Sequence, residues 1–131
     1  MKLVLDTSGW YAVTVRSDKN YVKAERFAEE GHQLVVLETV FEELMALLHN
    51  RHGKEIAVNT GVELRNLGVT GLGKHEEKEA WELFEKSGAK VSYVDCTVAV
   101  VAKKLDVPVF GFDGDFRKLG VEVVPAVDRL V

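Results

Sequence analysis

Four acidic residues follow apolar segments of this sequence or lie just beyond them: Asp6, Glu43, Asp95 and Asp113. Carboxylates that gather in one place repel one another, so their burial is costly unless their pKa values rise or a cation neutralises them. Ligand sets made only of oxygen suit hard divalent ions such as Mg2+ or Mn2+. A pair of such ions can generate hydroxide, orient a phosphodiester and stabilise the leaving oxygen. If the fold brings them together, these residue types therefore predict a metal-dependent phosphodiesterase.

Strands that alternate with helices would bring the four acids to one place. Short apolar runs predict strands over Leu3–Leu5, Gln33–Leu37, Val107–Phe110 and Val121–Val124. Helical spacing predicts helices from about Tyr21, Val40 and Glu77 that stop near Gly31, Gly53 and Gly88, and a weaker helix over 54–67 that Thr60 and Gly61 interrupt. This alternation implies a parallel sheet with helices on both faces, in three layers. Ligands of such folds bind beyond the carboxyl ends of the strands, where most of these acids are expected.

The segment 95–105 is ambiguous, because its valines also suit a strand. Its apolar residues keep a helical spacing, Asp95 is a good N-cap, and Lys103 and Lys104 stand where a helix dipole favours cations. We therefore predict a helix. Its apolar character on nearly all sides indicates that this helix is buried.

Helical geometry separates Glu42 from Glu43. At roughly 100° per residue, Glu43 borders the apolar stripe of Val40 and Leu44, whereas Glu42 points nearly away from it. We expect Glu43 to reach the sheet edge and Glu42 to be solvated. Glu38 either precedes this helix or lies in its first turn.

Each acid also has a plain structural interpretation. Asp6 can turn the chain or cap a helix, Asp95 can serve only as an N-cap, and Asp113-Gly-Asp is a common turn sequence. Glu43 taken alone would be a solvated helix residue. The set stands out because one architecture brings all four to the same edge.

Composition predicts one cytoplasmic domain over residues 1–131. Of the 131 residues, 47% are hydrophobic and 29% are charged, which is ordinary for a globular protein. We expect no membrane segment and no signal peptide, since no apolar stretch approaches about 20 residues. The single cysteine, Cys96, excludes an internal disulfide. A net charge of −4 argues against a constitutively basic nucleic-acid binder, but not against an enzyme that meets nucleic acid through metal ions.

Taken in order, these motifs resemble the PIN domain, and in particular the VapC-type toxin ribonucleases. The resemblance covers essentially the whole chain and is carried by Leu5-Asp6-Thr7-Ser8, Glu43-Leu44, Asp95 before an Ala/Val-rich helix, Val109-Phe-Gly-Phe-Asp-Gly-Asp-Phe116, and Leu119-Gly-Val121. It implies a three-layer α/β/α PIN-like fold with a central parallel sheet. It also implies a site in which Asp6, Glu43, Asp95 and Asp113 hold Mg2+ or Mn2+, with Thr7, Ser8 and Asp115 as auxiliary residues.

The activity implied by this resemblance is hydrolysis of RNA by metal-activated water. As the toxin of a type II toxin–antitoxin module, the chain would form a homodimer and bind a cognate antitoxin. Candidate RNA contacts are Arg16, Lys19, Arg51 and Lys54, with His52, Lys103, Lys104 and Arg117 as alternatives.

The chain departs from the family's pattern at Gly111, where many members have Thr or Ser two residues before the last aspartate. A polar side chain is therefore missing from the edge of the expected site. This departure leaves open a catalytically silent PIN-like domain, or a housekeeping RNA-processing or RNA-binding scaffold. A phosphatase fits poorly, because Ser8 stands where its second aspartate would be.

Other reactive residue types are interpreted as structural. His49 and His52 are spaced to share a metal, but no third inward ligand is evident near them. Cys96 lies in an Ala/Val helix and is expected to be a small core residue. Trp10 is expected in the core or a dimer contact, although an exposed aromatic there would stack a base.

Overall fold

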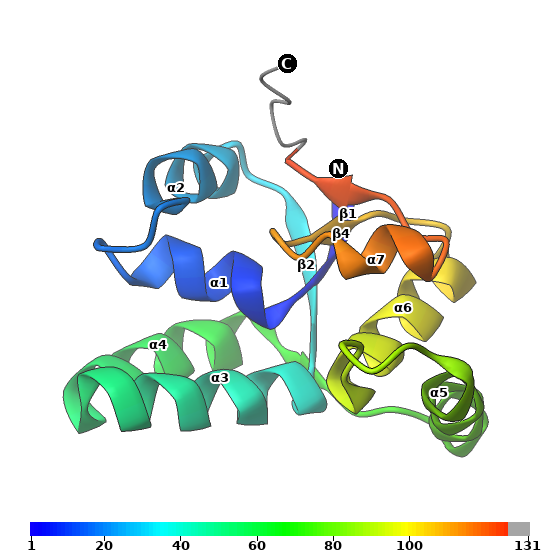
Figure 1. The fold of residues 1–131 in the computed structure, drawn as a ribbon. Coiled ribbons are helices and arrows are strands. Elements are labelled where there is room, and N and C mark those ends of the chain that lie inside the picture. The colour runs from blue at the N-terminus through cyan, green and yellow to red at the C-terminus, as the bar shows by residue number, and fades with distance from the viewer. Residues whose placement is uncertain (126–131) are drawn as a thin grey trace.

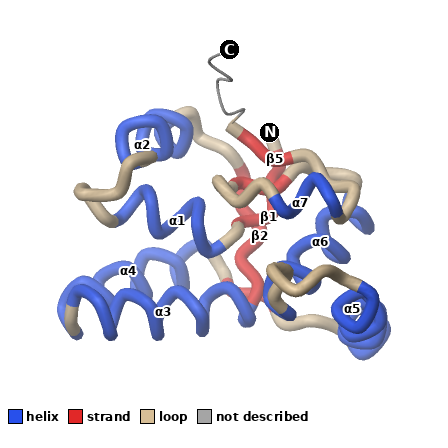
Figure 2. Tube along the Cα trace, in the orientation of Figure 1, coloured by secondary structure: helices blue, strands red, loops and turns tan. Residues whose placement is uncertain are grey.

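A parallel sheet runs through the middle of the fold, with helices on both faces (Figures 1 and 2). The computed structural model describes residues 1–125. In chain order its elements are β1 Lys2–Leu5, α1 Thr7–Thr14, α2 Tyr21–Glu29, β2 Gln33–Leu37, α3 Glu38–His52, α4 Lys54–Leu67, β3 Val69–Thr70, α5 Lys74–Lys86, α6 Tyr93–Leu105, β4 Val109–Phe110, α7 Asp115–Lys118 and β5 Val123–Val124.

The five strands are all parallel and lie in the order β3-β2-β1-β4-β5. Helices α1 to α4 lie on one side of the sheet, and α5, α6 and α7 lie on the other (Figure 1). The predicted three-layer α/β/α architecture is therefore confirmed. None of the helices within residues 1–125 has both the length and the apolar character needed to cross a membrane.

Strand β1 is the centre of the sheet, because β2 pairs with one of its edges and β4 with the other. Leu3, Val4 and Leu5 are fully buried, as expected for a parallel strand covered on both faces. Leu5 pairs with Phe110, and the Asp6 N–H donates to the Phe110 carbonyl at 2.9 Å. This register sets Asp6 directly beside the residue that follows β4.

The predicted strands near the C-terminus are longer than the observed ones. Pairing in that region is confined to β4 and β5, with two residues each. Strand β3 and helix α7 were not expected, because elements of two and four residues carry too little periodicity to be recognised in a sequence.

Helix α4 is continuous, although Thr60 and Gly61 made it the weakest of the predicted helices. Both residues lie on its buried side. A Cβ at Gly61 would stand 3.0 Å from the Met45 sulfur on α3, so the small residue permits the close approach of these two helices. The apparent interruption in the pattern is therefore a packing contact.

The residues interpreted as structural pack largely as expected. Cys96 is fully buried and Trp10 is nearly so. The His52 Nε2 lies 2.9 Å from the Tyr11 hydroxyl, so this ring joins the ends of α1 and α3. Trp81 contacts the rings of Phe84 and Tyr93, but about half of its surface remains exposed.

We predict that Gly9→Ala destabilises the protein. A Cβ at this position in α1 would lie 2.4 Å from the Phe110 carbonyl oxygen, so the helix and β4 would have to move apart. Overpacking of this kind costs about 1–3 kcal/mol, which exceeds the gain in helix propensity from alanine. Urea denaturation of Gly9→Ala measures the change. Gly88→Ala is the control, since nothing lies within 4 Å of a Cβ at Gly88; equal stability of the two variants would contradict the prediction.

Candidate active site

Four segments bring acidic side chains towards the carboxyl ends of β1 and β4. Asp6 follows β1, Glu43 lies in the second turn of α3, Asp95 lies in the first turn of α6, and Asp113 lies in the loop before α7. The Asp95 charge acts on Asp6, and the charges of Glu43 and Asp113 act on Asp95. Asp6, Glu43 and Asp113 are therefore each within electrostatic reach of Asp95.

The Asp6 carboxylate is the most deeply buried acid of this group, with 3% of the residue exposed. It is the N-cap of α1, and its Oδ2 accepts hydrogen bonds from the Ser8 hydroxyl at 2.6 Å and the Ser8 N–H at 3.3 Å. Burial raises the pKa of Asp6 to about 7, the Ser8 hydrogen bonds oppose that shift, and the Asp95 charge adds to it. Asp6 can therefore cap α1 and also belong to an acidic site, because the same carboxylate caps the helix and is acted on by the charge of Asp95.

Ser8 occupies the space beside Gly111. Its hydroxyl donates to Asp6 Oδ2 and accepts from the Phe112 N–H at 2.9 Å, which links the ends of β1 and β4. A Cβ at residue 111 would stand 3.0 Å from the Ser8 Oγ and 3.0 Å from the Asp6 Cβ. A hydroxyl is therefore present at this edge of the site, but it comes from residue 8. The Thr7 hydroxyl is also buried, and it has no hydrogen-bond partner among the described residues.

Asp95 was expected to be an N-cap that follows a short apolar run, and this detail is wrong. Ser92 is the N-cap of α6, and Asp95 is its third residue. The two form a capping box: the Ser92 Oγ accepts from the Asp95 N–H, and Asp95 Oδ2 accepts from the Ser92 N–H, both at 3.0 Å. This fixes one Asp95 oxygen on the backbone. Partial burial raises the pKa of Asp95, and Asp113 and Glu43 act in the same direction.

Glu43 is positioned by a contact between α3 and α6. The hydroxyls of Thr39 and Thr97 lie 2.8 Å apart, and Thr97 Oγ1 donates to the Val94 carbonyl at 2.7 Å. Thr39 lies one turn before Glu43 on α3, so this contact directs the same face of the helix towards α6. Glu43 is half-buried and Glu42 is exposed, which confirms the predicted orientation of the two. Glu38 is the first residue of α3, with Leu37 as the N-cap.

Asp113 and Asp115 form a local turn before α7. The Asp115 N–H donates to Asp113 Oδ1 at 2.9 Å, so one Asp113 oxygen is held by the backbone. Asp115 Oδ1 lies 3.4 Å from the Lys118 ammonium. Asp115 thus orients Asp113 and connects it to a basic residue.

The chemistry of the donors fits a hard divalent cation, although the side chains as they stand do not enclose one. Within residues 1–125, no three His, Cys, Asp or Glu side chains are close enough to hold a metal ion together. Mutual repulsion favours separation of uncompensated carboxylates, and a cation between them would reverse that preference. The buried Asp6, whose ionisation is costly here, is the observation that favours a cation.

The basic residues named as candidate RNA contacts lie away from these acids. Arg51 is eight residues after Glu43, or roughly 12 Å farther along α3. Arg16 and Lys19 follow the C-terminal end of α1, and Lys54 begins α4 just after the C-terminal end of α3. The acids lie towards the N-terminal ends of α1 and α3 (Figure 1). Sequence reasoning did not identify Lys86, Lys90 and Lys118, which line a pocket together with Asp115.

We predict that Asp6→Asn stabilises the metal-free protein, and more so at pH 8 than at pH 5. Burial raises the pKa of Asp6 in the folded protein to about 7, whereas the ordinary pKa of an aspartate is 3.8. The contribution of Asp6 to stability therefore falls as the pH rises from about 4 to about 7, by at most about 4 kcal/mol. Asparagine stays neutral and can still accept from Ser8.

Urea denaturation in EDTA at both pH values measures this gain. Glu63→Gln, at an exposed position inside α4, controls for the loss of one negative charge. No gain from Asp6→Asn at pH 8 would show that the buried carboxylate is not a destabilising feature.

We predict that Gly111→Ser destabilises the protein, and that the effect is smaller when Ser8 is replaced by alanine. The added side chain meets the Ser8 hydroxyl in the wild type, and Ser8→Ala removes that hydroxyl. A double-mutant cycle should give a coupling free energy of about 1 kcal/mol between the two positions. Strict additivity would mean that Ser8 does not compete for the space at residue 111.

Comparison with known proteins agrees with this geometry. Residues 3–122 match the family described as PIN domain. Mycobacterium tuberculosis VapC20, a sarcin–ricin loop cleaving toxin, superposes with a TM-score of 0.83 and 27% identity over 91% of this chain and 95% of that chain. No curated protein gave a significant sequence match.

Two more distant structures share the fold. VapBC2 from Rickettsia felis, bound to promoter DNA, gives a TM-score of 0.69 at 13% identity over 94% of this chain and 97% of that chain. FitAcB from Neisseria gonorrhoeae gives a TM-score of 0.68 at 14% identity over 94% of this chain and 96% of that chain. The family match spans nearly all of the described residues, including the four acids. This chain belongs to the PIN domain family.

Proposed function

We propose that this protein is a Mg2+- or Mn2+-dependent endoribonuclease and the toxin of a type II toxin–antitoxin module in the cytoplasm. The observation that supports the proposal is the buried Asp6 carboxylate at the end of the central strand, on which the charge of Asp95 acts, while the charges of Glu43 and Asp113 act on Asp95. The similarity to VapC20, a sarcin–ricin loop cleaving toxin, supports the same assignment.

Asp6, Glu43, Asp95 and Asp113 are the residues that would hold the ion. When bound, it would lower the pKa of a water molecule and neutralise charge on the phosphate. Two of these carboxylates each have an oxygen fixed by the backbone, Asp95 on Ser92 and Asp113 on Asp115. Each keeps its other oxygen for a ligand, because a carboxylate has two.

Ser8 is a positioning residue in this proposal. Its hydroxyl donates to Asp6 Oδ2 and accepts from the Phe112 N–H. These two hydrogen bonds would keep Asp6 in place relative to the loop that carries Asp113. The polar contact expected from residue 111 in the family is made from residue 8. Gly111 is therefore compatible with an active enzyme.

An antitoxin and a second copy of the chain complete the proposal. The similar VapC20 is described as a toxin, which supports a cognate antitoxin as the partner of this chain. Arginine side chains of an antitoxin would satisfy the carboxylates as a cation does. Homodimer formation follows from the family resemblance.

A silent scaffold or housekeeping RNA-processing subunit is the alternative. It is favoured by the finding that, within residues 1–125, the carboxylates do not enclose an ion as they stand. Competition between Mn2+ and Mg2+ for the protein separates the two functions, because a silent scaffold has no need to bind either ion.

We predict that Glu43→Gln and Asp95→Asn each lower RNA cleavage by at least about 100-fold in Mn2+, and that EDTA abolishes cleavage. Loss of residues that only orient metal ligands costs 10- to 100-fold, so loss of a ligand should cost at least as much. Cleavage of a mixed RNA pool by purified protein is the measurement. Glu42→Gln is the matched control, because it removes a neighbouring, exposed carboxylate from the same helix.

Equal residual cleavage by all variants would reveal a contaminating nuclease. Absence of cleavage together with absence of Mn2+ binding would favour the silent scaffold.

A further inference from the structure

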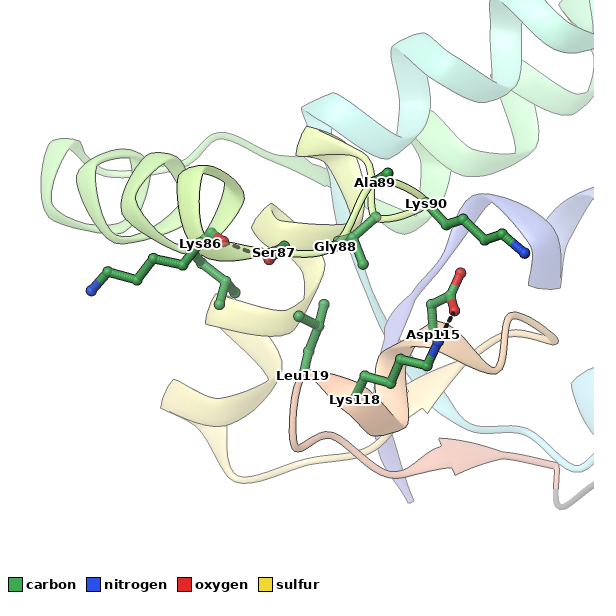
Figure 3. Close-up of a pocket in the computed structure, with 10 residues that line it drawn as sticks. Lys86, Ser87, Gly88, Ala89, Lys90, Asp115, Lys118 and Leu119 are labelled. Atoms are coloured by element: carbon green, nitrogen blue, oxygen red, sulfur yellow. Dashed lines mark hydrogen bonds and ion pairs between the residues drawn. The ribbon is translucent and has the colours of Figure 1, made fainter.

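A pocket of about 330 Å³ lies between the loop that joins α5 to α6 and the short helix α7 (Figure 3). Leu83, Val91 and Leu119 give it apolar walls, and the last two are almost fully buried. Ligand pockets of small molecules begin at about this volume, and they combine apolar walls with a few polar groups. One nucleotide is a ligand of this size.

The rim of this pocket is basic. Lys86, Lys90 and Lys118 line it, and Asp115 is the single acid among its lining residues. Lys118 and Lys90 extend towards the Asp115 side of the opening, whereas Lys86 points the other way (Figure 3). The pocket therefore carries a positive charge in a protein whose net charge is −4.

The pocket adjoins the acidic site through two of its walls. Val91 immediately precedes Ser92, the N-cap of the helix that carries Asp95. On the other wall, the Asp115 N–H donates to Asp113. A ligand in the pocket would thus lie beside the loop and the helix that carry two of the four carboxylates.

We propose that this pocket binds one nucleotide of a single-stranded RNA, next to the phosphodiester held at the carboxylates. The base contacts the apolar wall of Leu83, Val91 and Leu119, and Lys90 and Lys118 bind a backbone phosphate. This inference rests on the proposed ribonuclease function and adds a subsite to it. An acidic peptide would also be attracted to the lysines, but it offers no planar base for the apolar wall and no phosphodiester for the neighbouring acids.

The first test asks whether the lysines of the rim contribute to RNA binding. In an Asp95→Asn background, which prevents cleavage, Lys90→Gln and Lys118→Gln should each weaken binding of a short single-stranded RNA by about 3- to 10-fold. Each should also lower the slope of log K against log salt by about one, because one phosphate contact is lost. Lys78→Gln, on the exposed side of α5, is the matched control and should leave affinity unchanged.

The second test asks whether RNA binding needs the volume of the pocket, and it uses variants that leave the charge unchanged. Gly88 lies in its wall, and nothing lies within 4 Å of a Cβ at this residue, so a side chain is tolerated there. Gly88→Leu and Ala89→Leu place bulk at two adjacent positions that line the pocket. At least one should weaken RNA binding by about 3-fold or more with the salt slope unchanged, since no charge is altered.

Failure of the subsite differs from failure of the proposed function. Cleavage by the wild type together with unchanged affinity of the lysine and pocket-filling variants would overturn the subsite and leave the nuclease intact. If RNA binding depends on Lys90 but the wild type cleaves no RNA, the subsite is supported and the proposed nuclease activity is contradicted. If Lys90→Gln weakens binding of poly-glutamate but not binding of the RNA, the pocket binds an acidic peptide and the proposal is wrong.

Discussion

The Asp6 carboxylate is removed from water at the end of the central strand, and the local fold is arranged around that constraint. Among the described residues, the groups that act on it are the hydroxyl and amide of Ser8, the Thr7 amide and the negative charge of Asp95. Burial raises its pKa to about 7 despite the hydrogen bonds from Ser8 and Thr7, so the fold retains a group that is costly to ionise in the absence of a cation. A core built only for stability would place an apolar residue here.

The backbone supplies part of the compensation. Helices α1, α3 and α6 all begin near this edge, and the partial positive charge at a helix N-terminus favours nearby carboxylates. Asp6 caps the first of these helices, and Asp95 belongs to the capping box of the third. Parallel strands require the helices that directly follow them, α1 and α3, to start at the same edge. Helix α6 follows α5 rather than a strand, and the contact between Thr97 and Thr39 holds its first half against α3.

The sequence predicted the parts of this site that depend on local pattern. Asp6 and Asp113 were found because they follow strands, and Glu43 was separated from Glu42 by helical phase. The capping box of Ser92 and Asp95 was present in the sequence, but the apolar run 91–94 resembled the end of a strand and concealed it. Contacts between distant segments could not be predicted: the fit of Ser8 against Gly111 depends on the register of β1 and β4, which no local pattern encodes.

An acidic protein that acts on a polyanion must separate the charges that bind metal from those that bind phosphate. If the chain has the proposed function, the two kinds of charge meet at Asp115, whose backbone N–H donates to Asp113 and whose carboxylate pairs with Lys118. The Lys118 side chain is about three-quarters exposed, and ion pairs of that kind contribute little stability. Lys118 can therefore exchange Asp115 for a phosphate at small cost, while the backbone hydrogen bond to Asp113 does not depend on that pair. Net charge is thus a poor guide to nucleic-acid binding when exposed lysines lie beside acidic residues.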